Sequence, residues 1–100
     1  MKNFRTFQLA VEFYKTTRTL VLPAALKEQL SRAAPSIALN LAEGSARPTS
    51  KDQKRFFQIA FGSARECQAI LTLAELQNTK AWSLLDSLSA HIYKLIKYGG

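Results

Sequence analysis

The sequence predicts an all-α fold, an antiparallel up-down-up-down bundle of four helices in one domain over residues 1–100. Apolar residues recur at spacings of three and four in four separate stretches, which is typical of amphipathic helices. The chain has only four glycines and three prolines, so little material remains for loops. We expect helices at about residues 3–20, 24–46, 51–77 and 81–98, and the short connections between them favour antiparallel neighbours.

The first helix, at about residues 3–20, is apolar on two sides, and Asn3 is its expected N-cap. One strip comprises Phe4, Phe7, Val11 and Tyr14, and a second strip, roughly opposite, comprises Leu9, Phe13 and Leu20. A helix that is apolar on two sides usually buries both of them. The second strip therefore packs either at the edge of the bundle or between subunits, and we take its three residues as candidates for an oligomer interface.

The second helix begins after Leu22-Pro23, because proline cannot continue the preceding helix. Its apolar face comprises Leu26, Leu30, Ala34, Ile37 and Leu41. Pro35 lies within the helix and predicts a kink between Ser31 and Pro35, since it removes one backbone hydrogen bond. A polar stripe runs beside the apolar face and comprises Gln29, Arg32, Ser36, Asn40, Glu43 and Arg47.

The third and fourth helices follow short turns at about residues 47–50 and 78–80. Ser50 or Thr49 is the expected N-cap of the third helix. The core face of that helix is predicted to comprise Phe56, Ala60, Ser63, Cys67, Ile70 and Ala74. Gly62 costs about 1 kcal/mol relative to alanine inside a helix, so we expect a packing reason for it. The fourth helix supplies Leu84, Leu85, Leu88, Ile92, Leu95 and Ile96 to the core.

The formal net charge of +7 indicates an anionic partner such as nucleic acid, or a membrane surface. The excess is spread evenly, with seven basic and three acidic residues in positions 1–50 and seven and four in positions 51–100. A basic surface without any ligand is the alternative. No apolar run is long enough for a signal peptide or a transmembrane helix, and the single cysteine excludes an intrachain disulfide, so we expect a cytoplasmic protein.

Enzymatic chemistry finds little support in the residue pattern. No histidine follows any glutamate at the Glu-x-x-His spacing of di-metal bundles, and one cysteine and one histidine cannot form a zinc site. Cys67 on an apolar face is expected to be a buried structural thiol. Glu43 and Glu66 form either an acid–base pair or part of a structural polar seam, and we favour a seam of Arg32, Asn40, Glu43, Ser63 and Glu66. We therefore expect no enzyme, no metal and no cofactor.

Two basic clusters are candidates for nucleic-acid contact. The denser one lies at the junction of the second and third helices and comprises Arg47, Lys51, Lys54 and Arg55. The second comprises Lys94 and Lys97, together with Tyr93 and Tyr98. Basic side chains beside a helix N-terminus suit phosphate binding, and bases can stack on exposed aromatic rings. A solvated charged face is the alternative for each cluster.

Two motifs resemble a known family. They are Gln29-Leu30-Ser31-Arg32-Ala33-Ala34 with Asn40-Leu41-Ala42-Glu43-Gly44, and Arg55-Phe56-Phe57-Gln58-Ile59-Ala60 with Gly62-Ser63-Ala64-Arg65-Glu66. They are similar to the central motifs of a bacterial four-helix-bundle family encoded by intervening sequences in large-subunit ribosomal RNA genes. A related branch is the accessory protein of diversity-generating retroelements. Pro35, and a first helix without tryptophan, depart from the family pattern.

The resemblance implies a ring-like homopentamer, and in the related branch a basic protein that binds nucleic acid and a reverse transcriptase. Combined with the charge of +7, it leads to the hypothesis of a non-enzymatic oligomeric protein that binds RNA or another nucleic acid. The alternative is a protein-interaction scaffold, for example an accessory subunit of a reverse transcriptase, in which nucleic-acid contact is secondary.

Overall fold

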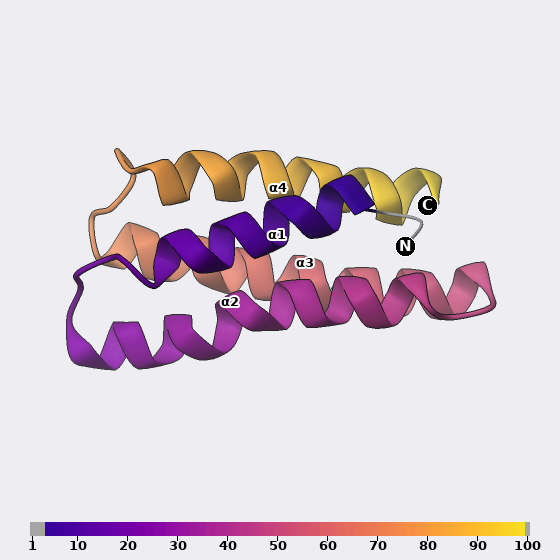
Figure 1. The fold of residues 1–100 in the computed structure, drawn as a ribbon, viewed down its shortest axis with the longest axis horizontal. Coiled ribbons are helices and arrows are strands. Elements are labelled where there is room, and N and C mark those ends of the chain that lie inside the picture. The colour runs from indigo at the N-terminus through magenta and orange to yellow at the C-terminus, as the bar shows by residue number, and fades with distance from the viewer. Residues whose placement is uncertain (1–3, 100) are drawn as a thin grey trace.

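The computed structural model describes residues 4–99, which form four α-helices: α1 (Phe4–Thr17), α2 (Ala24–Ser45), α3 (Ser50–Leu73) and α4 (Lys80–Tyr98). Successive helices run antiparallel, and the start of α1 and the end of α4 lie at the same end of the bundle as the turn between α2 and α3 (Figure 1). Each helix packs on two neighbours, so that α1 and α3 lie diagonally opposite, as do α2 and α4. The predicted all-α class and its four helices are confirmed for this part of the chain.

The start of α3 and the course of α2 follow from local chemistry. Thr49, rather than Ser50, caps α3, because its hydroxyl accepts a hydrogen bond from the backbone N–H of Asp52 at 3.2 Å. The helix α2 is continuous through Pro35, and Figure 1 shows that it bends partway along its length, as expected for an internal proline. The N-cap predicted at Asn3 lies outside the described residues.

Helix α1 ends three residues earlier than predicted, at Thr17. The Thr16 hydroxyl donates to the carbonyl of Glu12 at 2.9 Å, and the Thr17 hydroxyl donates to that of Tyr14 at 2.6 Å. Threonine hydroxyls offer backbone groups an alternative to the helical ladder, and the chain must also leave the helical conformation before Pro23. The three threonines at positions 16, 17 and 19, followed by Pro23, therefore account for the early end of the helix.

Helix α3 ends four residues earlier than predicted, at Leu73. Glu75 has a φ of 58°, the left-handed conformation, and its N–H donates to the carbonyl of Thr72 at 3.0 Å. The N–H of Leu76 donates to the carbonyl of Leu71 at 2.9 Å. These two bonds form the Schellman motif that closes many helices, here with glutamate in the position usually occupied by glycine. The unusual residue explains why the sequence pattern did not indicate this helix end.

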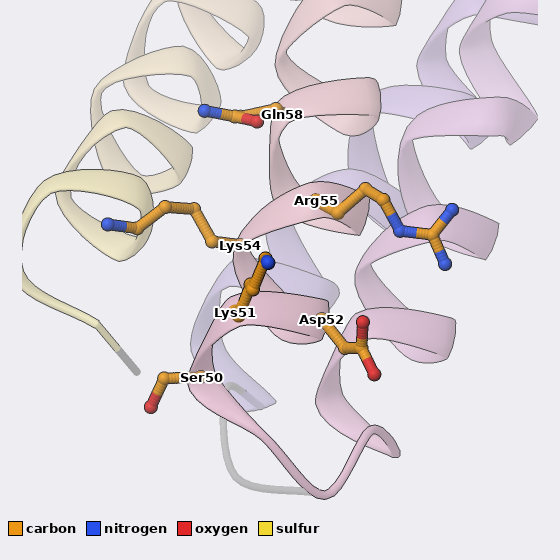
Figure 2. Close-up of a pocket in the computed structure, with 6 residues that line it drawn as sticks. All are labelled: Ser50, Lys51, Asp52, Lys54, Arg55 and Gln58. Carbon is orange, nitrogen blue, oxygen red and sulfur yellow. The ribbon is translucent and has the colours of Figure 1, made fainter.

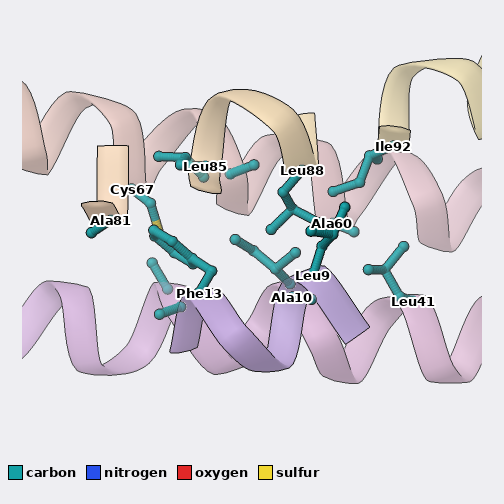
Figure 3. Packing of buried hydrophobic residues seen from close by; sticks show 14 of the residues in the cluster. Leu9, Ala10, Phe13, Leu41, Ala60, Cys67, Ala81, Leu85, Leu88 and Ile92 are labelled. Atoms are coloured by element: carbon teal, nitrogen blue, oxygen red, sulfur yellow. The ribbon is translucent and has the colours of Figure 1, made fainter. Parts of the chain in front are cut away.

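The core runs the length of the bundle, and all four helices contribute to it (Figure 3). Leu9 and Phe13 are fully buried in it, and Leu20 packs against it. The prediction of an oligomer interface is therefore wrong for Leu9 and Phe13, because the protomer itself buries them, whereas the partly buried Leu20 is not tested. The other strip of α1 is the more accessible one, with Phe7, Val11 and Tyr14 only partly covered.

The core face of α3 is rotated relative to the prediction. Phe57, Ala64 and Leu71 are buried, together with the expected Ala60, Cys67 and Ile70. Phe56 lies outside the core cluster. Burial, reinforced by the nearby Glu66 carboxylate, raises the pKa of the Cys67 thiol to about 12, so this cysteine is the inert thiol expected of an apolar face.

The two helical glycines differ in their surroundings. A Cβ added to Gly44 would lie 2.7 Å from Cε1 of Phe57, so glycine is what allows α2 and α3 to approach closely at this point. A Cβ added to Gly62 would have no described atom within 4 Å. The packing reason predicted for Gly62 is therefore absent from the described protomer, whereas Gly44 has one.

Candidate nucleic-acid interface

The fold gathers basic side chains at one end of the bundle. We call residues 4–10, 36–61 and 88–99, which lie nearer the turn between α2 and α3, the junction half, and residues 11–35 and 62–87 the loop half (Figure 1). The junction half contains seven basic and two acidic residues, and the loop half contains six and five. Like charges at one end of a molecule add in their long-range field. Antiparallel packing thus concentrates a positive charge that is evenly spread along the sequence.

Phe56 is contacted by two guanidinium groups on the outer side of α2 and α3. The Cζ atoms of Arg47 and Arg55 lie 4.8 and 4.7 Å from the centroid of its ring. Glu43 Oε1 lies 3.6 Å from Arg47 Nη2, a half-exposed pair of the kind that contributes at most about 1 kcal/mol. Among residues 4–99, no carboxylate lies within ion-pair distance of Arg55. Both guanidinium groups are therefore held by the ring; the charge of Arg47 is shared with a half-exposed carboxylate, and that of Arg55 has no carboxylate partner among the described residues.

Three residues of the predicted junction cluster lie together at the start of α3. A shallow hollow over the first turns of α3 is lined by Ser50, Lys51, Asp52, Lys54, Arg55 and Gln58 (Figure 2). In this view the side chain of Lys54 extends towards α4, whereas that of Arg55 extends towards α2. Lys51, Lys54 and Arg55 thus share one hollow, and Arg47, the fourth residue of the predicted cluster, does not line it.

The two predicted clusters meet between the start of α3 and the end of α4. A second hollow there is lined by Ser50, Gln53, Lys54, Phe57, Leu95, Lys97, Tyr98 and Gly99. Lys97 Nζ lies 5.9 Å from the ring centroid of Tyr93 and 5.7 Å from that of Tyr98. Lys94 is exposed but lines neither of these two hollows. The structure thus joins Lys54 with Lys97 and leaves Lys94 apart.

The predicted polar seam is shorter than the sequence pattern suggests. Ser36 Oγ and Ser63 Oγ lie 2.9 Å apart across α2 and α3, and Asn40 Nδ2 donates to the Ser36 carbonyl at 2.8 Å. The other three residues are exposed and lie outside this group: Arg32 pairs with Glu28 on its own helix, Glu43 pairs with Arg47, and Glu66 faces solvent. These three residues lie on the predicted sides of their helices, but they are exposed to solvent, so their charges need no buried partner. The seam is therefore a small hydrogen-bonded contact between two helices.

Three large apolar side chains on α2 and α3 face solvent: Leu39 is 68% exposed, Ile59 44% and Leu73 70%. Leu39 follows Ser36 by three residues and Ile59 precedes Ser63 by four. On antiparallel helices both therefore lie one turn from the Ser36–Ser63 contact, in the same direction. These residues form an accessible apolar surface on α2 and α3, more exposed than the partly covered strip of α1.

Chemically reactive groups are sparse in the described part of the chain. Residues 4–99 contain no group of three or more His, Cys, Asp or Glu side chains placed to hold a metal ion. His91 Nδ1 donates to the carbonyl of Ser87 at 2.8 Å, an ordinary contact within α4. Within the same residues, none of the helices has the length and apolarity to cross a membrane.

Phe56 is the site residue that the sequence did not identify. It was assigned to the core, but its neighbour Phe57 occupies that place. Adjacent residues of a helix point in directions about 100° apart, so two neighbouring large rings rarely fit the same core equally well, and the Phe56-Phe57 pair is one signal that one ring can lie outside it. Arg47 and Arg55 nearby in the sequence are the second signal, because guanidinium groups pack well on aromatic rings.

One family model matches the chain, over residues 4–98, and its description is 23S rRNA-intervening sequence protein. Neither the comparison with curated proteins nor that with solved structures gives a match. The family match spans all four helices, whereas the motifs quoted above lie between Gln29 and Glu66. It therefore extends the resemblance to α1 and α4.

Proposed function

Because the chain belongs to the 23S rRNA-intervening sequence protein family, we propose that it is a non-enzymatic protein that binds RNA through the junction half of its bundle. The observation that carries this proposal is the charge distribution: seven basic against two acidic residues in one half, and near balance in the other. Phosphate contacts supply most of the affinity of such surfaces for nucleic acid.

Two features of the junction half favour phosphate binding over a merely solvated surface. Arg47 and Arg55 are fixed against Phe56, and a planar guanidinium can bind a phosphate through two parallel hydrogen bonds. Lys54 and Lys97 come from different helices yet line the same hollow. Cations thus lie on both sides of α3. An RNA strand that runs across this end of the bundle can therefore contact cations on α2, α3 and α4.

The test is the salt dependence of RNA binding in two variants that each lose four positive charges. One replaces Arg47, Lys51, Lys54 and Arg55 with glutamine, and the control replaces the exposed loop-half residues Lys15, Arg18, Arg65 and Lys80 with glutamine. Each phosphate contact contributes about 0.7–0.9 to the slope of log K against log salt. We expect the junction variant to reduce the slope by up to about 3, and the control to change it little.

Equal effects of the two variants would mean that net charge, rather than the junction half, determines binding. Affinity for RNA that does not fall as salt rises would contradict the electrostatic mechanism altogether. Circular dichroism of both variants checks that the helices are retained, which matters because Arg47 and Arg55 pack on Phe56.

We further propose that the protein forms the ring-like homopentamer that the family resemblance implies, with Leu39 and Ile59 in the subunit interface. Both side chains expose large apolar surfaces on neighbouring helices, and burial against another subunit removes them from water. Five copies of the junction half would combine weak contacts into tight binding through avidity.

Light scattering at micromolar concentration tests this assembly. We expect the wild-type protein to be an oligomer, and the Leu39→Glu, Ile59→Glu double variant to be a monomer. Val21→Glu is the matched control, because Val21 is exposed but lies in the connection between α1 and α2. A wild-type monomer would contradict the assembly, and an oligomer that survives the double variant would place the interface elsewhere.

The same apolar surface supports the second candidate function, a scaffold or accessory subunit that contacts a protein such as a reverse transcriptase. Affinity capture of the partner before and after nuclease treatment separates the two functions. A direct protein contact survives digestion of the nucleic acid, whereas a contact bridged by RNA is lost. Loss of capture in the Leu39→Glu, Ile59→Glu variant would assign the contact to this surface.

A further inference from the structure

The end of α4 exposes two aromatic rings beside cations. Tyr98 is 75% exposed and Tyr93 50% exposed. The Tyr93 ring also meets Phe61, with 6.3 Å between the ring centroids. Elsewhere in the bundle Phe13 and Phe57 are buried in the core. Aromatic surface left in water at the most basic end of the molecule is available to a ligand with a flat apolar face.

The hollow beneath Tyr98 supplies the polar partners of such a ligand. It contains Lys54 and Lys97 from two helices, with Ser50 and Gln53 beside them. Lys97 Nζ lies within 6 Å of both tyrosine rings, at 5.9 and 5.7 Å. An anionic group bound by Lys97 therefore lies within a few ångströms of a ring on which a base can stack.

This combination distinguishes single-stranded from double-stranded nucleic acid. Phosphates are accessible in both, so lysines alone do not discriminate between them. In a duplex the faces of the bases are already stacked on one another, whereas an unpaired base has a free face for an aromatic side chain. Tyr98 therefore adds affinity only for a strand whose bases are unpaired.

The geometry points to single-stranded RNA as the ligand, with one unpaired base stacked on Tyr98 and neighbouring phosphates held by Lys54 and Lys97. This inference rests on the proposed function, because it specifies which RNA the junction half prefers. It also predicts little dependence on base identity, since every base has a π face and no side chain in the hollow is needed to read a base edge.

The experiment compares wild-type protein with Tyr98→Leu and Tyr98→Phe, on a single-stranded RNA of about 12 nucleotides and on the duplex of the same length. We expect wild type to bind the single strand more tightly at equal salt. Tyr98→Leu should weaken single-strand binding by roughly 5- to 100-fold, the effect of losing one base–aromatic stack. It should leave duplex affinity and the salt slope unchanged, and Tyr98→Phe should behave as wild type.

A second measurement reports stacking directly. A single strand that contains 2-aminopurine should lose fluorescence on binding to wild type or Tyr98→Phe, and should keep it on binding to Tyr98→Leu. Salt-dependent binding of both RNAs without any effect of Tyr98→Leu would overturn the stacking inference and leave the proposed function intact. Absence of salt-dependent binding to either RNA would overturn both.

Discussion

The two halves of the bundle share one continuous core but have different surfaces. The loop half nearly balances its basic and acidic residues, while the junction half combines an excess of cations with Phe56, Tyr93 and Tyr98 outside the core. The surroundings of the helical glycines also differ. Gly44 in the junction half packs against Phe57, whereas a Cβ added to Gly62 in the loop half would have no described atom within 4 Å. Packing in both halves maintains the fold, whereas surface chemistry is concentrated in one of them.

The largest expected effects are on the free energy of unfolding, and they test whether the two halves contribute equally to one core. Phe13 in the loop half and Phe57 in the junction half are both fully buried. Replacing either with alanine should lower the free energy of unfolding by about 3–5 kcal/mol, because each change leaves a cavity of similar size. Urea denaturation followed by circular dichroism measures both. A difference of more than about 2 kcal/mol between the two variants would show that one half contributes more to stability.

Gly44→Ala should also destabilise the protein, by less. The new methyl group would lie 2.7 Å from Phe57 Cε1 and 3.0 Å from Phe56 Cβ, and the buried Phe57 ring has little room to move. Overpacking of about 1–3 kcal/mol exceeds the gain of about 1 kcal/mol in helix propensity. We expect a lower midpoint of thermal unfolding. A higher midpoint would mean that α2 and α3 can separate without loss of contacts.

Gly62→Ala is the matched change in the loop half, and its expected effect has the opposite sign. No described atom lies within 4 Å of the new Cβ, so the helix-propensity gain of about 1 kcal/mol should appear as increased stability. The same thermal melt measures it. If the variant instead dissociates an oligomer in light scattering, Gly62 lies in a contact between subunits, and the proposed interface at Leu39 and Ile59 extends along α3 into the loop half.

The smallest expected effect concerns Glu75, where α3 ends. Its left-handed φ of 58° costs an L-residue roughly 1 kcal/mol that glycine does not lose. Glu75→Gly should therefore raise the free energy of unfolding by about 0.5–1 kcal/mol. Glu75→Ala serves as the control, because alanine has the same steric cost as glutamate. Equal stability of the two variants would contradict the conformational explanation.

The sequence was sufficient for the number, order and approximate limits of the helices, because apolar periodicity and scarce breakers determine them. It was insufficient for the rotation of α1 and α3 about their axes. The strip with Leu9 and Phe13 has the same period as the strip with Phe7 and Val11, and only the neighbouring helices decide which is buried. The choice between Phe56 and Phe57 was open for the same reason.

The candidate site was predicted in its composition but not in its arrangement. Lys51, Lys54 and Arg55 line one hollow, as their closeness in sequence suggests, but Lys54 extends towards α4 and Arg55 towards α2, and Lys97 joins Lys54 from another helix. The concentration of charge at one end depends on antiparallel pairing of segments far apart in the sequence. No local pattern contains that information.

The contact of two arginines with Phe56 has a consequence for how an anion would be bound. A free arginine side chain loses up to about 2 kcal/mol of rotational freedom when it is immobilised by a ligand. With Cζ atoms held 4.8 and 4.7 Å from the ring centroid, Arg47 and Arg55 have lost part of that freedom before any ligand arrives. The aromatic ring thus preorganises two cations, and the entropic cost of binding a phosphate group is correspondingly lower.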